Sequence, residues 1–169
     1  MRIQSFSVLS GLLAMGLLWV VAIAAAADTG KDNAADILKV RNVEITFHQA
    51  GSWLPKPDLD LMMSLYADDA VLTDTAHGNK IYSGKNQVRE YFANVAAPFR
   101  PNNHWIGYTP AMRIKASVDG DKATLYFECL WMDIDKNAIG VHAFSDMTLV
   151  RAGDQWQVKT IRVGKVDKL

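Results

Sequence analysis

The sequence predicts an α+β domain in which helices cover one face of an antiparallel sheet. Apolar residues at helical spacing occur before residue 101, whereas alternating strand patterns separated by turn signals occupy residues 104–166. Helices that come first and strands that come last are typical of this fold class. The 169 residues, half of them apolar, suffice for one domain with its own hydrophobic core.

Three helices are expected, over residues 36–49, over residues 58–66 and after Ser83, which we expect to cap the third. Apolar residues spaced by about one helical turn define the buried face of each helix. These residues are Ile37, Val40, Ile45 and Phe47 in the first helix, Leu59, Met62, Met63 and Tyr66 in the second, and Val88, Tyr91, Phe92 and Val95 in the third. Pro98 and Pro101 end the third helix.

Strands are expected mainly in the second half of the chain. Residues 70–73 and 81–82 are short strands that can pair with each other. Four long strands are expected over residues 104–117, 123–133, 139–151 and 155–166, with a turn between each consecutive pair, at residues 119–120, 135–137 and 152–154. The long strands form an antiparallel meander, and a sheet of this length that curls leaves a concave side for a small apolar ligand.

The first 27 residues read as an export signal rather than as part of the fold. Residues 3–27 contain no charged side chain, and the small residues Ala25-Ala26-Ala27 directly precede Asp28. This pattern predicts a signal peptide over residues 1–27 and a mature domain over residues 28–169, located in the periplasm or secreted. The alternative is an uncleaved anchor formed by residues 3–27, because about 20 apolar residues can span a bilayer. Contact with a membrane is expected only in that case.

Composition narrows the choice of partners and cofactors. The chain has 18 basic and 18 acidic residues and shows no polybasic patch, which excludes the electrostatic basis for binding nucleic acid. Its one cysteine, Cys129, cannot form an internal disulfide or a zinc cluster, and we expect it to fill space in the core. The histidines lack metal-ligand spacing, and no phosphate-binding or dinucleotide motif occurs. We therefore expect neither a metal nor a cofactor.

One segment carries a family resemblance. Residues 66–74 read Tyr-Ala-Asp-Asp-Ala-Val-Leu-Thr-Asp, and Tyr82-Ser83-Gly84-Lys85 then opens a helix. Together with the order of helices and strands over residues 34–166, this segment resembles the nuclear-transport-factor-two-like superfamily, specifically its SnoaL-like and ketosteroid-isomerase-like branch. The resemblance implies a cone-shaped cystatin-like fold, with three N-terminal helices packed on a curved antiparallel sheet of about six strands, and a homodimer. The superfamily holds isomerases, dehydratases, cyclases and members without demonstrated chemistry.

The same resemblance implies three catalytic residues. Asp74 falls where the steroid isomerase keeps its general base, and Asp146 aligns with the carboxylic acid that this isomerase keeps protonated. His104 is similar to the strand histidine of related dehydratases. The tyrosine that these enzymes carry on their first helix is absent, since no tyrosine occurs between Asp28 and Met63. Losing such a donor costs about 10²–10³ in rate, so steroid isomerisation by the known arrangement is not expected.

The residues also allow plainer interpretations. Asp74 is either a pocket base whose pKa burial raises or a cap for the polar turn over residues 75–79. His104 can be a surface residue that opens a strand. Glu128, the only charged residue within residues 123–132, either faces the pocket or pairs across the outer sheet, and we favour pairing.

Strand alternation adds further ligand-binding candidates. It places His142, Phe144 and Asp146 on one face of their strand, where they line the pocket or face solvent, and Met147 and Leu149 on the other, which looks packed. If instead Met147 and Leu149 face outward, they suit a homodimer. The residues expected to bind ligand are Tyr108, Tyr126, Glu128, His142 and Phe144.

Together these features predict an exported protein that binds a small apolar organic molecule. If it is an enzyme, it is a cofactor-independent isomerase or lyase that transfers a proton on an apolar ring or enolisable compound. Asp74 would be the base, and His104 or Asp146 would polarise an oxygen. One alternative is a non-catalytic binder that uses the same pocket. Another is a membrane-tethered assembly module that uses the exposed sheet face.

Overall fold

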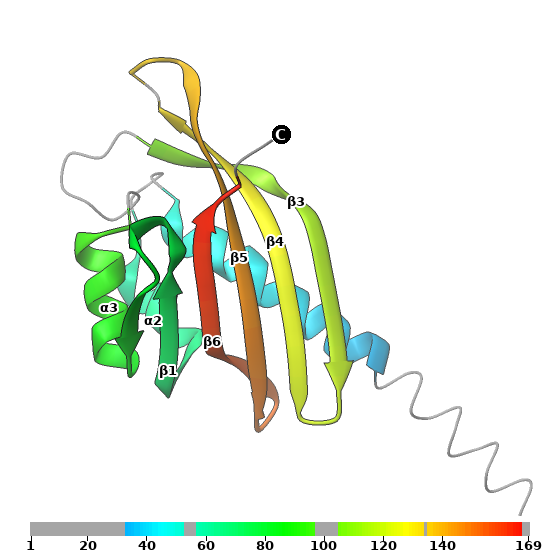
Figure 1. Ribbon diagram of the computed structural model, residues 1–169. Coiled ribbons are helices and arrows are strands. Elements are labelled where there is room, and N and C mark those ends of the chain that lie inside the picture. The colour runs from blue at the N-terminus through cyan, green and yellow to red at the C-terminus, as the bar shows by residue number, and fades with distance from the viewer. Residues whose placement is uncertain (1–32, 53–56, 97–104, 134, 167–169) are drawn as a thin grey trace, which may run out of the picture. The chain divides into compact units, whose positions relative to one another are not determined.

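The structure is a computed structural model that describes residues 33–52, 57–96, 105–133 and 135–166 (Figure 1). The side chains of residues 105–110 are not among those described. By its contacts the chain divides into residues 1–36 and residues 37–169, and the fold below is that of the second unit. The predicted signal peptide or anchor lies outside the described residues. None of the helices within those residues combines the length and the apolar character needed to cross a membrane.

The described part of the N-terminal helix covers residues 33–51, close to the prediction. Its buried face differs from the predicted one, because Ile45 is 48% exposed. The buried apolar residues of the helix are Val40, Val43, Phe47 and Ala50. Glu44 and His48 are buried beside them. These positions follow the i, i+3, i+4, i+7 spacing from Val40, whereas Ile45 falls on the far side of the helix.

The second helix, α2 (Leu59–Ser64), is shorter than predicted. Asp58 caps its start by accepting a hydrogen bond from the Leu61 N–H at 2.9 Å. The prediction that the helix includes Tyr66 is wrong, because Tyr66 begins strand β1 (Tyr66–Asp74). There it pairs with Val158, whose N–H donates to the Leu65 carbonyl at 2.8 Å, so sheet pairing ends the helix.

The third helix, α3 (Lys85–Asn94), follows strand β2 (Lys80–Ser83). The predicted cap at Ser83 is wrong, because Ser83 ends β2 and the helix has no side-chain cap. Gly84 makes the turn with φ of 82°, a conformation that favours glycine. Val88, Tyr91 and Phe92 of α3 are buried, as predicted.

The predicted meander is confirmed. It consists of β3 (Trp105–Asp119), β4 (Lys122–Asp133), β5 (Ala138–Ala152) and β6 (Gln155–Lys165), each antiparallel to the next. With β1 and β2 the sheet has six strands in the order β2-β1-β6-β5-β4-β3. One pairing departs from the expected antiparallel arrangement, because β1 pairs with β6 in parallel, with Leu72 opposite Ile161. The fold is the predicted α+β class.

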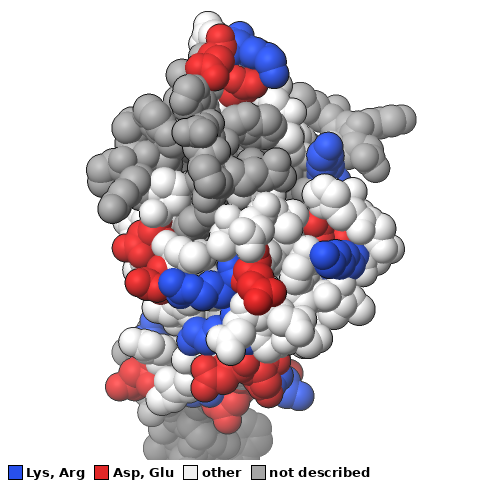
Figure 2. Space-filling model, turned by 90° about the vertical axis from the view of Figure 1, so that its left-hand side faces the viewer, with Lys and Arg blue, Asp and Glu red and all other residues white. Residues whose placement is uncertain are grey.

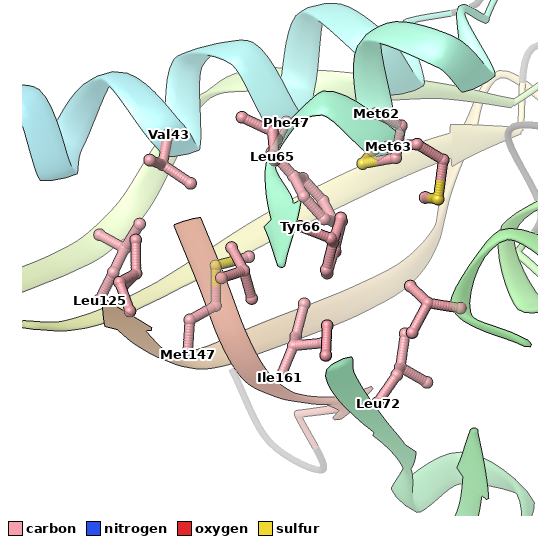
Figure 3. Close-up of a cluster of buried hydrophobic side chains, with 14 of the residues drawn as sticks. Val43, Phe47, Met62, Met63, Leu65, Tyr66, Leu72, Leu125, Met147 and Ile161 are labelled. Carbon is pink, nitrogen blue, oxygen red and sulfur yellow. The ribbon is translucent and has the colours of Figure 1, made fainter. Parts of the chain in front are cut away.

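The core is built from one face of the sheet together with the N-terminal helix, α2 and α3 (Figure 1). Val43 and Phe47 from the helix, Leu125 and Met147 from the sheet, and Tyr66 gather there (Figure 3). Because Met147 and its strand neighbour Leu149 are buried in this core, they do not face outward as a dimer contact.

Surface charges are mixed on the face shown in Figure 2, where acidic and basic side chains are interspersed. Two ion pairs tie helices to neighbouring elements. Arg89 of α3 lies 2.6 Å from Asp60 of α2, and Lys85 lies 3.7 Å from Asp68 of β1. Such exposed pairs contribute little stability, so the core carries most of it.

Gly164→Ala is expected to destabilise the protein by about 1–3 kcal/mol through overpacking. A Cβ at Gly164 of β6 would lie 2.7 Å from Phe144 Cε1 and would collide with Thr75 Oγ1, which donates a hydrogen bond to the Val163 carbonyl. Gly51→Ala is the matched control, because its Cβ would meet Trp131 at an ordinary 3.5 Å. Urea denaturation of both variants tests this, and an equal effect at the two sites would contradict it.

Candidate functional site

Apart from Asp133, the buried polar side chains and the polar groups that pair with them fall into two groups, one on each face of the sheet. The helix-facing cluster, defined by the face on which its members are buried, comprises Glu44, His48, Asp74, Cys129 and Ser145. The outer-face cluster comprises Arg113, Tyr126, Glu128 and His142, with Phe144 packed beside it. Strand alternation separates them, because Cys129 and Ser145 point toward the helix while Glu128 and His142 point away from it.

His48 is the centre of the helix-facing cluster. Its Nδ1 lies 2.7 Å from Glu44 Oε1 and 2.9 Å from the Glu44 carbonyl oxygen, one helical turn away. The two side chains are only 4% and 8% exposed. The ring packs against Phe127, with centroids 5.2 Å apart. Since Nδ1 donates to Glu44, Nε2 is the nitrogen left for other partners.

Nε2 of His48 makes no hydrogen bond to any of the described residues. Burial lowers the pKa of His48, but its interactions with Cys129 and Glu44 outweigh burial and raise the pKa from 6.5 to about 9. At neutral pH the imidazole therefore keeps both protons. By distance and angle the Nε2–H has no acceptor among the described residues, although Cys129 lies near enough to influence the pKa of the ring. A buried donor of this kind is stabilised by an acceptor such as an oxygen atom.

The raised pKa makes a prediction about stability. A group that binds its proton more tightly in the folded state stabilises the protein fully below its unfolded pKa of about 6.5 and loses that effect as pH rises through about 9. The contribution of His48 to the free energy of unfolding should therefore decrease as pH rises from about 6.5 to about 9. The free energy of unfolding of the wild type, compared with His48→Gln from pH 6 to 9.5, measures it. A gap between the two proteins that stays constant over this range would contradict the prediction.

Asp74 ends β1 on the same face as Leu72 and is almost fully buried. Its Oδ1 accepts the Ala76 N–H at 3.0 Å, and its Oδ2 lies 2.6 Å from His77 Nδ1. The His77 ring is 61% exposed. Asp74 therefore caps the polar turn, as one interpretation of the sequence expected, and also places a buried carboxylate at the edge of the helix-facing side.

The three residues predicted to be catalytic do not form one site in the described structure. Asp146 lies on the outer face, 45% exposed, with Oδ2 3.5 Å from Arg162 Nη1. Asp74 faces the opposite side of the sheet, so the two carboxylates do not converge. Ser145, the neighbour of Asp146, is the polar β5 residue buried on the helix-facing side among those described. His104 lies outside the described residues.

Glu128 holds the outer-face cluster together. Its carboxylate accepts hydrogen bonds from Arg113 Nη1 at 2.9 Å, from Tyr126 Oη at 2.7 Å and from His142 Nε2 at 2.8 Å. Burial raises the pKa of Glu128, but the hydrogen bonds from Tyr126, Arg113 and His142 outweigh burial and lower it. Glu128 is thus paired across the outer sheet, which is the alternative that the sequence favoured.

The remaining ligand-binding candidates lie around this group. The Phe144 ring stacks on Tyr126, with centroids 6.3 Å apart. Tyr108 pairs with Leu130 through the backbone of β3 and β4, and its side chain is outside those described. The structure therefore brings Tyr126, Glu128, His142 and Phe144 together, but on the face away from the helix.

Sequence reasoning missed Glu44, His48 and Arg113. The signal for the first two was present, because positions 44 and 48 fall within the stripe that begins at Val40. No sequence pattern indicated Arg113, because its position depends on a φ of 50° at a point where the pairing of β3 with β4 is irregular. No group of three or more possible metal ligands occurs among the residues that the structure describes.

Comparison with known proteins identifies the family. A family model for the SnoaL-like domain matches residues 34–162. An NTF2-like protein of unknown function from Pseudomonas putida KT2440 has a TM-score of 0.66 at 18% identity, over 80% of this chain and 90% of its own. An NTF2-like protein with a cystatin-like fold from Novosphingobium aromaticivorans has a TM-score of 0.64 at 12% identity, over 86% and 90%.

A third solved structure is that of an enzyme. Hexachlorocyclohexane dehydrochlorinase LinA-type3 from Novosphingobium barchaimii LL02 has a TM-score of 0.61 at 18% identity, over 77% of this chain and 86% of its own. None of the curated proteins matches the sequence. The family model covers most of the chain, and the solved structures share its cystatin-like, NTF2-like fold. The chain therefore belongs to the SnoaL-like domain family.

Proposed function

We propose that this protein binds a small apolar ring compound on the helix-facing side of the sheet and transfers a proton on it. The observation that carries the proposal is the Nε2–H of His48, a buried donor without an acceptor among the described residues. The rings of Phe47 and Phe127 pack against the His48 ring, so a ligand that satisfies the donor presents one oxygen atom on an otherwise apolar body. Proton transfer of this kind requires no cofactor.

The chemistry assigns one role to each group. Asp74, the base expected from the sequence, takes a proton from the carbon next to a carbonyl group. His48 donates a hydrogen bond to the carbonyl oxygen, where negative charge develops as the proton leaves. Glu44 positions His48 by holding Nδ1 at 2.7 Å. His48 thus takes the role that the sequence gave to His104 or Asp146, because Asp146 lies on the other face of the sheet.

Two further points belong to this proposal. The dehydrochlorinase among the structural neighbours is named for a halogenated ring compound, which supports an apolar ring as the ligand. Export and a homodimer are also proposed, on the uncharged N-terminal segment and on the family resemblance. Intact mass of the protein recovered from the exported compartment tests export, with a chain that begins at Asp28 as the expected result.

Hydrogen exchange tests the proton transfer without knowledge of the substrate. We expect the protein to accelerate exchange of α-hydrogens in a panel of cyclic ketones dissolved in D₂O, followed by NMR. The same concentration of protein unfolded in urea gives the background. Ketones that bind without exchange would establish a non-catalytic binder instead. A panel that neither binds nor exchanges would overturn the proposal.

A further inference from the structure

We propose that Cys129 and His48 form a nucleophilic pair that adds reversibly to α,β-unsaturated carbonyl compounds. The inference rests on the proposed ligand site but adds a bond-forming step and a narrower ligand class, the cyclic enones. Cys129 was expected from the sequence to be an inert core residue. Strand alternation places its side chain on the face of β4 against which His48 packs, and His48 Nε2 lacks a hydrogen-bond acceptor among the described residues.

Contacts of the N-terminal helix place Cys129 opposite His48. The His48 ring packs against Phe127 with centroids 5.2 Å apart. Less than one turn later, a Cβ on Gly51 would lie 3.5 Å from Trp131 Cη2. Phe127, Cys129 and Trp131 are alternate residues of β4, so their side chains share one face of the strand. Cys129 lies between the two contacts and therefore faces the helix where His48 is.

The side chains of Glu44, His48 and Cys129 supply a carboxylate, an imidazole and a thiol, in the order that activates a cysteine. Glu44 holds Nδ1 of His48, and Nε2 is left on the side of the ring away from that carboxylate. A protonated imidazole beside a sulfur favours the thiolate, which is the nucleophilic form. All three side chains are buried, which keeps water from competing for the sulfur or for a bound ligand.

The step balances without an oxidant or a second reactant. The Cys129 thiolate attacks the β-carbon of the enone, and an Sγ–C bond forms as the carbon–carbon π bond breaks. The displaced electron pair moves to the carbonyl oxygen and gives an enolate, which accepts a hydrogen bond from His48. The Nε2 proton is then delivered to the α-carbon, and His48 becomes neutral. In the reverse direction His48 removes that proton and the thiolate leaves.

Labelling of the full chain with 2-cyclohexen-1-one at pH 7, followed by intact mass spectrometry, tests the proposal. Because the chain contains one cysteine, an adduct that disappears in Cys129→Ser belongs to Cys129. An ordinary thiol with a pKa of about 8.5 is only a few per cent ionised at pH 7, so we expect the native protein to react roughly tenfold faster than the urea-unfolded chain.

The labelling rates of variants distinguish activation of Cys129 by His48 from simple exposure of its thiol. We expect His48→Gln to slow labelling of the native protein about tenfold, and Glu44→Gln to slow it less, because the histidine remains. Arg41→Gln is the control, since it removes a positive charge from the exposed side of the same helix. Circular dichroism establishes that each variant is folded. In urea all variants that retain Cys129 should react at one rate, because the pairing is lost.

Two results would overturn the inference. One is a native wild type that labels more slowly than the unfolded chain, and the other is a folded His48→Gln or Glu44→Gln variant that labels as fast as wild type. Saturated cyclic ketones lack the conjugated double bond to which the thiolate adds, so exchange of their α-hydrogens does not require the proposed conjugate addition by Cys129. Exchange without labelling would reject only the nucleophilic pair, and labelling without exchange would reject only the proton transfer by Asp74.

Discussion

Asp74→Asn is expected to lower the rate of α-hydrogen exchange in cyclic ketones by about 10²–10⁴-fold, the usual contribution of a general base. The amide has nearly the same shape as the carboxylate but cannot accept the proton. NMR in D₂O, at ketone concentrations that saturate each protein, compares the two. The expected loss is in the exchange rate of the bound ketone, because the His48 donor that binds the carbonyl oxygen is unchanged.

The substitution should leave the fold intact. The amide oxygen of the new side chain can still accept the Ala76 N–H, which in the wild type donates to Asp74 Oδ1 at 3.0 Å. The lost charge pair with His77 involves an exposed ring, and such pairs contribute at most about 1 kcal/mol. A small change in the free energy of unfolding would therefore accompany a large change in rate.

His77 provides the decisive control, because it lies 2.6 Å from Asp74 Oδ2 and could itself be the base. If Asp74 takes the proton, His77→Gln keeps most of the exchange, since the amide can still donate to Oδ2. If Asp74 only orients His77, His77→Gln abolishes exchange as completely as Asp74→Asn does. That second outcome would identify His77 as the base. If a folded Asp74→Asn variant keeps the full rate of exchange, Asp74 is not the base.

The sequence predicted those parts of the fold that depend on local patterns. The meander from β3 to β6 follows from strand alternation and from turns such as Asp119-Gly120, and both are read within a few residues. The parallel pairing of β1 with β6 was missed because it joins segments about 90 residues apart, with no local signal. The end of α2 at Ser64 was missed for the same reason, since the backbone of Val158 ends it.

The site was harder to predict than the fold. Alternation correctly placed Met147 with the packed face of β5 and His142 and Asp146 on the other, but it could not tell which face the helix covers. The resemblance then led to Asp146, although its neighbour Ser145 is the residue on the helix-facing side. Cys129 was judged by its neighbours in sequence, whereas its partner His48 comes from a helix about 80 residues earlier.

Glu128→Ala is expected to destabilise the protein by about 3–5 kcal/mol, the usual cost of removing one member of a buried charged network. The carboxylate accepts hydrogen bonds from Arg113, Tyr126 and His142. Arg113 is mainly exposed and can be rehydrated. His142 is 6% exposed, and its Nδ1 already lacks a partner among the described residues, so the substitution leaves both ring nitrogens unpaired. Urea denaturation at pH 7 measures the loss.

A double-mutant cycle identifies the source of that loss. In Glu128→Ala/His142→Leu the unpaired imidazole is gone, so most of the stability should return even though the ion pair is absent. If the two single effects simply add, the cost comes from packing around Glu128 and the network explanation is wrong.

The free energy of unfolding at acidic pH provides an independent test of the same network. The pKa of Glu128 is lowered in the folded protein from its usual 4.5, so its contribution to stability is present above that pH and is lost as pH falls through the folded value. The wild type should therefore lose more of its free energy of unfolding on acidification below about pH 4.5 than Glu128→Ala does. Equal losses in the two proteins would show that the carboxylate is not stabilised in the fold. The three donors would then not hold its charge, and the outer-face cluster would not be a folding element.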